Sequence, residues 1–132
     1  MNALITTARY RRASRMIWSS MLVLAALAHI VAHEAFAAYY PTYLPLRDAA
    51  ITGTAFVEVI LAVLLWTRYE RLGWILVSIL MVVYLPVHVF VVTDHAAVIN
   101  PPYFIPLWMA WARLVMQGGL IAWSAHLAYR AN

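Results

Sequence analysis

The chain has 132 residues, of which 66% are hydrophobic and 11% are charged, and its mean hydropathy is +0.81. Soluble domains average about 45–50% apolar and about 25% charged residues, so this composition excludes an ordinary soluble domain and favours a membrane protein. No cysteine is present and all nine basic residues are arginine, which excludes thiol, iron–sulfur and lysine Schiff-base chemistry. The net charge of +4 comes from arginines that cluster at the ends of apolar runs, so we expect no nucleic-acid binding.

The first expected element is a membrane helix over residues 16–39. Its apolar run is too long for the hydrophobic region of a signal peptide. Residues 40–48 are expected to form an extended loop, because prolines and tyrosines interrupt the apolar run. A second membrane helix is expected over residues 49–67, and it carries Glu58 near the middle of the bilayer.

After a short basic turn, a third membrane helix is expected over residues 72–92, and Pro86 should kink it. Residues 93–106 form a second loop, and a fourth membrane helix follows over residues 107–129. We therefore predict an all-α polytopic membrane protein in which one domain, residues 1–132, forms four transmembrane helices. Short connections between the helices favour an up-down-up-down bundle.

The arginines predict the orientation of this bundle. Cytoplasmic segments of membrane proteins carry an excess of arginine and lysine. Seven arginines lie on one side of the predicted bundle, and only Arg47 lies in a loop on the other. The seven are Arg9, Arg11, Arg12, Arg15, Arg68, Arg71 and Arg130. We therefore expect both termini in the cytoplasm, a location in the plasma (bacterial inner) membrane, and the lipid bilayer as a partner.

Each predicted helix carries two polar residues four positions apart in its outer half, and such residues share one helix face. Ionisable groups are costly at membrane depth, so these faces should point into the bundle and form a polar pocket that opens outward. The loops at 40–48 and 93–106 should form its lid. The pairs are His29/His33, Thr54/Glu58, Tyr84/His88 and Arg113/Gln117.

These residue types suit proton transfer and ligand binding. His29, His33 and Glu58 are the candidate catalytic residues, because histidine and glutamate can act as general acids and bases. The candidate substrate-binding residues, which can donate hydrogen bonds to a ligand, are Tyr84, His88, Arg113 and Gln117.

Glu58 and Arg113 are each unfavourable alone at membrane depth, and arginine essentially never loses its proton. We expect each to neutralise the other, directly or through Gln117 or His29. The alternative to a functional pocket is a buried ion pair that fixes the helix register and does no chemistry.

A metal centre is a further possibility. His29 and His33 can chelate one transition metal from a single helix face, and His88 or Glu58 from another helix would add a third ligand. Haem binding is a different possibility, because imidazoles from two facing helices can occupy the two axial positions of the haem iron.

Short motifs between residues 28 and 125 suggest a family. They are His33-Glu34-Ala35-Phe36, Tyr39-Tyr40-Pro41, Leu44-Pro45, Gly53 to Glu58, Leu61 to Leu65, Arg71-Leu72-Gly73, Leu85-Pro86-Val87-His88, Trp111-Ala112-Arg113-Leu114, Gln117 and Ile121-Ala122-Trp123. In this order they resemble DoxX-like membrane proteins.

The resemblance implies a four-helix membrane fold. Some DoxX-like proteins are named as subunits of thiosulfate:quinone oxidoreductases, and others are placed with thiol-redox partners. Glu58, Pro86, Arg113 and Gln117 match the family pattern, whereas His29 has no counterpart that we can place. Because this chain lacks cysteine, any redox role requires a quinone, a cofactor or a partner protein.

Three interpretations of function remain open. The first is a redox-linked membrane subunit whose pocket binds a quinone or a similar lipophile. The second is a noncatalytic accessory subunit of a larger membrane complex, which would have other membrane proteins as partners. The third is a metal- or haem-binding protein built on His29, His33 and His88. Proton-shift isomerisation of a lipid ranks below these three.

Overall fold

The computed structural model describes residues 2–95 and 104–131. Over these residues the chain is helical and contains no strand, which confirms the all-α prediction. The helices, in chain order, are α1 (Asn2–Val31), α2 (His33–Ala38), α3 (Arg47–Leu64), α4 (Glu70–Val83), α5 (Leu85–Thr93) and α7 (Leu107–Arg130).

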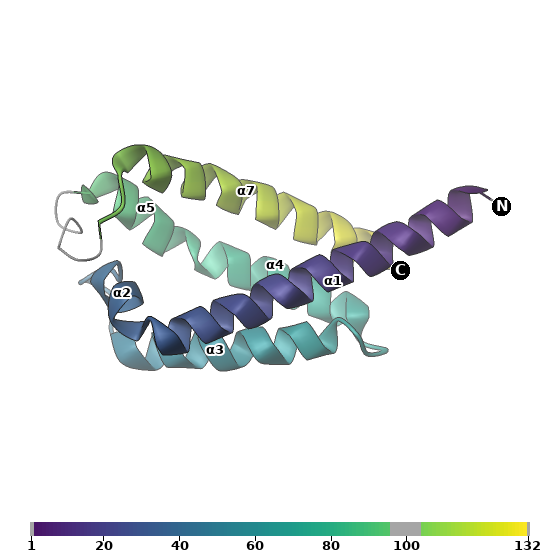
Figure 1. Cartoon of the computed structure of the whole chain (residues 1–132), viewed down its shortest axis with the longest axis horizontal. Helices are drawn as coiled ribbons and strands as arrows, with labels where there is room; N and C mark the ends of the chain where they lie inside the picture. Colours follow the sequence, from purple (N-terminus) through teal and green to yellow (C-terminus); the bar gives the residue numbers. More distant parts are fainter. Residues whose placement is uncertain (1, 96–103, 132) are drawn as a thin grey trace.

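The helices lie in two antiparallel pairs (Figure 1). Contacts are most extensive between α1 and α3 and between α4 and α7, and α5 continues along α7. Both termini lie at one end of the molecule, together with the turn between α3 and α4. We call this the arginine end, because it holds the arginines in the N-terminal half of α1, at the turn before α4 and at the end of α7, which are Arg9, Arg11, Arg12, Arg15, Arg68, Arg71 and Arg130. The opposite end, which holds α2 and the loop before α3, is the loop end.

The larger of two hydrophobic clusters lies nearer the arginine end and contains side chains from both helix pairs. Trp18 of α1 packs edge-on against Trp74 of α4, with ring centroids 6.2 Å apart. Its ring centroid also lies 5.4 Å from that of Trp123 in α7. Leu61 and Leu65 add the α3 contribution to this buried cluster. The two pairs are therefore held together at the arginine end.

Two helices are interrupted near the loop end. The first expected helix begins at Asn2 rather than at residue 16, and it breaks at Ala32, where α1 gives way to α2. The third is interrupted at Tyr84, two residues before Pro86. Proline cannot donate the next helical hydrogen bond, so this interruption agrees with the predicted kink.

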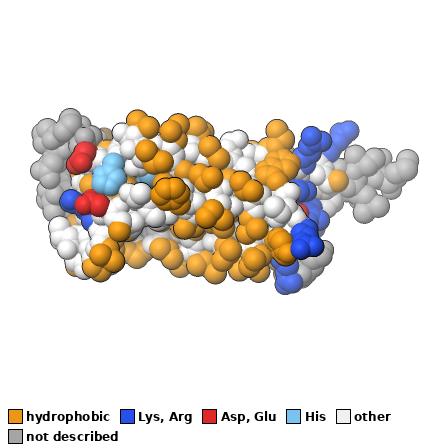
Figure 2. All heavy atoms as spheres, turned by 90° about the horizontal axis from the view of Figure 1, so that it is seen from below, with side chains coloured by type: hydrophobic (Ala, Val, Ile, Leu, Met, Phe, Trp, Pro, Cys, Tyr) orange, Lys and Arg blue, Asp and Glu red, His pale blue; other side chains and the backbone are white. Residues whose placement is uncertain are grey.

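The surface is strongly apolar along the length of the bundle. Two stretches in the described part of the chain are long and apolar enough to cross a membrane, Thr7–Val31 and Glu70–Thr93. Large apolar side chains on the other two long helices are also exposed, including Ile60 at 62% and Val115 at 73%. Figure 2 shows apolar side chains over the middle of one face, with arginines at one end and acidic side chains and histidine at the other.

Candidate functional site

A cavity of about 300 Å³ lies between the two helix pairs, in the half of the bundle nearer the loop end. We call it the outer cavity. Its volume is at the lower end of the range for small-molecule sites, about 300–1,000 Å³. Its polar lining residues are His29, Tyr40, Thr54, Glu58, Tyr84, His88 and Arg113, and its apolar ones are Ala25, Phe36, Leu44, Ala50, Ile51, Val83 and Val87.

Glu58 is the most buried ionisable group in this cavity, with a side chain that is 1% exposed. The Tyr84 hydroxyl donates a hydrogen bond of 2.6 Å to one carboxylate oxygen. Nδ1 of His29 lies 3.0 Å from the other oxygen. A buried carboxylate is strongly disfavoured unless its oxygens have such partners. The three residues therefore form one hydrogen-bonded set that joins α1, α3 and the α4–α5 boundary.

The position of His29 suits proton exchange with Glu58. Its ring is held against Phe36, with centroids 4.2 Å apart. If Glu58 is ionised, Nδ1 of His29 carries a proton and donates a hydrogen bond to the carboxylate oxygen. If Glu58 is protonated, Nδ1 of His29 can accept instead. The contact therefore allows one proton to pass between the imidazole nitrogen and the carboxylate.

Two of the four expected polar pairs line the cavity together, Thr54/Glu58 and Tyr84/His88. His29 lines the cavity but His33 does not, because the break at Ala32 removes His33 from the face of α1.

His33 instead lies near acidic groups at the loop end. Its Nε2 atom is 3.9 Å from Asp48, and its Nδ1 atom is 4.0 Å from Glu34. The structure therefore brings His29 to Glu58 but does not bring His33 there.

Gln117 is buried but lies outside the cavity lining. Its amide nitrogen donates a hydrogen bond of 2.5 Å to the Met81 carbonyl oxygen. This hydrogen bond joins α7 to the last turn of α4. The structure therefore places Gln117 between α7 and α4 and not in the wall of the outer cavity.

Arg113 lines the cavity from α7 and is half-buried. None of the ion pairs among the described residues joins Arg113 to an acidic side chain. Arg113 interacts electrostatically with Tyr39 and His88 instead. The expected direct pairing with Glu58 is not formed, and the carboxylate oxygens of Glu58 contact His29 and Tyr84 instead.

The described residues include no group of three His, Cys, Asp or Glu side chains that could hold a metal ion. The expected three-ligand set of His29, His33 and His88 is therefore not assembled here. His29 and His88 both line the outer cavity, on opposite helix pairs.

The loop between α2 and α3 covers part of the cavity, as expected for a lid. Tyr40 and Leu44 line the cavity, and the Tyr40 hydroxyl donates a 3.1 Å hydrogen bond to the Pro45 carbonyl oxygen. The Tyr43 ring packs edge-on against Phe90 of α5, with centroids 5.9 Å apart. Most of the second expected lid, residues 93–106, lies outside the described residues.

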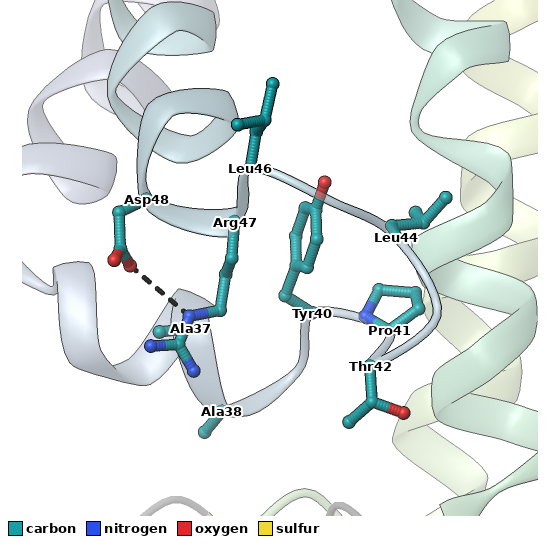
Figure 3. Close-up of a pocket in the computed structure, with 9 residues that line it drawn as sticks. All are labelled: Ala37, Ala38, Tyr40, Pro41, Thr42, Leu44, Leu46, Arg47 and Asp48. Carbon is teal, nitrogen blue, oxygen red and sulfur yellow. Dashed lines mark hydrogen bonds and ion pairs between the residues drawn. The ribbon is translucent and has the colours of Figure 1, made fainter.

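A second, more open hollow of about 560 Å³ lies on the same loop. Figure 3 shows Tyr40 inside the curve of the loop, with the side chain of Arg47 beside Asp48 across the hollow. The Nε atom of Arg47 donates a hydrogen bond of 3.3 Å to the Asp48 carboxylate. Both side chains are more than half exposed, so this hollow belongs to the solvated surface.

Sequence reasoning missed a polar cluster at the arginine end. Glu70 forms ion pairs with Arg11 at 3.0 Å and with Arg15 at 3.5 Å, and it accepts a 3.1 Å hydrogen bond from Trp74. The spacing of Arg11 and Arg15, one helical turn apart, is the signal that could have predicted a shared partner. It also missed Phe36, whose ring supports His29.

The fold and the cavity define a small all-α protein with an apolar outer surface and a buried Glu–His–Tyr set. The chain matches the family described as "Domain of unknown function (DUF8561)" over residues 18–128, and it belongs to that family. This range contains every residue that lines the outer cavity. No curated protein and no solved structure matches the chain. The resemblance to DoxX-like proteins therefore stays a prediction.

Proposed function

We propose that the protein is an integral membrane protein with four transmembrane helices and both termini in the cytoplasm. The apolar surface and the two long apolar stretches support this placement. α3 and α7 carry the charged residues Glu58 and Arg113, but both residues line the cavity and so need not meet lipid. The gathering of arginines at one end supports a cytoplasmic location for that end.

In this orientation the outer cavity lies toward the non-cytoplasmic side of the membrane. We propose that it binds a lipophilic molecule with a polar head group, of which a quinone is the leading candidate. The observation that carries this proposal is the Glu58 carboxylate, held by His29 and Tyr84 in the wall of an otherwise largely apolar cavity. Apolar lining with a few convergent polar groups is typical of small-molecule sites.

The proton-exchanging pair suits quinone chemistry in particular. Two-electron reduction of a quinone adds one proton to each of its two carbonyl oxygens. Glu58 and His29 can supply protons at the cavity wall. The chain has no cysteine to carry electrons, so an electron-donating partner protein must supply them. The protein would then act as the membrane subunit of an oxidoreductase, as the DoxX-like resemblance also implies.

A binding measurement tests this proposal. The purified protein in lipid nanodiscs is titrated with short-chain ubiquinone and menaquinone analogues by isothermal titration calorimetry. Ala50 lines the cavity, whereas its neighbour Ala49 is exposed. We expect saturable binding that Ala50→Phe abolishes by filling the cavity and that Ala49→Phe leaves unchanged. Equal binding by the two variants, or no saturable binding to the unsubstituted protein, would contradict the proposal.

A further inference from the structure

The two walls of the outer cavity differ in charge. His29 and Glu58 lie on the α1–α3 pair, whereas His88 and Arg113 lie on the α5–α7 pair. The acidic group is already satisfied within the protein, because each oxygen of Glu58 has a partner from another helix. Arg113 has no ion-pair partner among the described residues, which include all five acidic side chains of the chain.

Arg113 cannot reduce the cost of its burial by losing a proton. Its guanidinium presents five N–H donors in a planar fork that matches two oxygens of an anion. A half-buried guanidinium without a carboxylate is therefore well suited to bind a negatively charged oxygen that arrives from outside the chain. The apolar residues beside it, including Val83 and Val87, can accommodate a hydrocarbon portion.

We infer that the ligand of the outer cavity is a lipophile with an ionised acidic oxygen, which Arg113 binds while Glu58 and His29 face a second polar group of the same molecule. This inference rests on the proposed function, because it specifies the ligand of the same cavity. The ionised oxygen can belong to an acidic enol on a quinone ring or to the carboxylate of a fatty acid. Both groups present the same anionic oxygen to the guanidinium.

Two matched pairs of probes separate these sources. The first pair is a 2-hydroxy-3-alkyl-1,4-naphthoquinone, ionised at neutral pH, and its neutral methyl ether. The second pair is decanoate and its methyl ester. Binding to the full-length protein in nanodiscs is measured for all four compounds. A charge-assisted contact should make the ionised member of at least one pair bind about tenfold or more tightly than its neutral partner.

Variants of Arg113 assign this preference to one side chain. Arg113→Gln should remove the preference for the ionised probe, and Arg113→Lys should retain part of it because the charge remains. Arg47→Gln, a change of an exposed arginine outside the outer cavity, should leave the preference intact. Size-exclusion profiles and thermal unfolding establish that each variant is folded. If Arg113→Gln does not fold, the smaller preference of Arg113→Lys for the ionised probe provides the test.

The outcomes distinguish the inference from the proposal beneath it. If ionised and neutral probes bind with equal affinity, and Arg113→Gln changes neither affinity, the inference is overturned while the proposed ligand cavity stands. If no probe binds, both are overturned. Preference for the hydroxynaphthoquinone alone identifies a quinone-type ligand, preference for decanoate alone identifies a fatty acid, and either result supports the role of Arg113.

Discussion

The Tyr84 hydroxyl donates a 2.6 Å hydrogen bond to the Glu58 carboxylate and so connects the two helix pairs inside the outer cavity. Tyr84 stands at the interruption between α4 and α5, two residues before Pro86. The residue at the interruption between α4 and α5 is therefore also the one that donates a hydrogen bond to the buried Glu58 carboxylate.

Removal of this hydroxyl should destabilise the protein. Tyr84→Phe leaves one oxygen of a buried carboxylate without its partner, and we expect a loss of about 1.5–3 kcal/mol in the free energy of unfolding. The measurement is denaturant-induced unfolding in mild detergent. Tyr129→Phe, at a side chain that is 77% exposed, is the control and should cost little. An equal effect of the two substitutions would show that the hydrogen bond does not contribute.

The contact between His29 and Glu58 should appear as an interaction energy. In a double-mutant cycle with His29→Leu and Glu58→Gln, we expect a coupling of about 0.5–3 kcal/mol, the range for residues within one hydrogen-bond network. The parallel cycle with Arg113→Met and Glu58→Gln should give a much smaller coupling, because Glu58 contacts His29 and not Arg113. A larger coupling for Arg113 than for His29 would contradict this assignment of partners.

The sequence predicts the helices well because apolar runs and their interruptions are local signals. Pro86 marks the break in the third run, since its missing N–H acts on its own helix. Glu58 and His29 can be identified as site residues because ionisable groups are costly in an apolar run wherever it packs.

The errors in the candidate site have a different origin. The break at Ala32 has no proline or glycine to mark it, so the sequence predicts His33 on the same face as His29. The partner of Glu58 depends on which helices face each other in the bundle, and no helix carries that information alone. Gln117 shares a helix face with Arg113 in the sequence pattern, but its amide donates to the Met81 carbonyl oxygen and it does not line the outer cavity.

The orientation of the protein in the membrane can be tested with single cysteines, because the chain has none of its own. Thr42 is exposed at the loop end, and Ala13 is exposed near the arginine end. We expect a membrane-impermeant maleimide to label Thr42→Cys in intact cells and to label Ala13→Cys only after permeabilisation. The reverse pattern would show that the arginine end lies outside.

The residue before α3 offers a route to a more stable protein. Leu46 has a φ of 58°, in the left-handed region that a leucine rarely adopts, and its side chain is 76% exposed. Asparagine adopts this region more readily and favours helix N-termini, so Leu46→Asn should stabilise the fold by about 1 kcal/mol. Thermal unfolding measures the change. Leu46→Ala keeps the unfavourable backbone conformation and should give no gain, and a similar gain from both would show that the backbone is not the cause.

The most direct test of a lipophile site in the outer cavity is photoaffinity labelling in native-like membranes. An alkyl quinone that carries a diazirine is cross-linked to the full-length protein, and the modified residues are mapped by mass spectrometry. We predict labelling of Ile51, Thr54 and Val87 in the cavity lining, with protection by excess unlabelled quinone. Labelling confined to exposed apolar positions outside the cavity, such as Ile60 and Val115, without protection by excess quinone, would contradict the account.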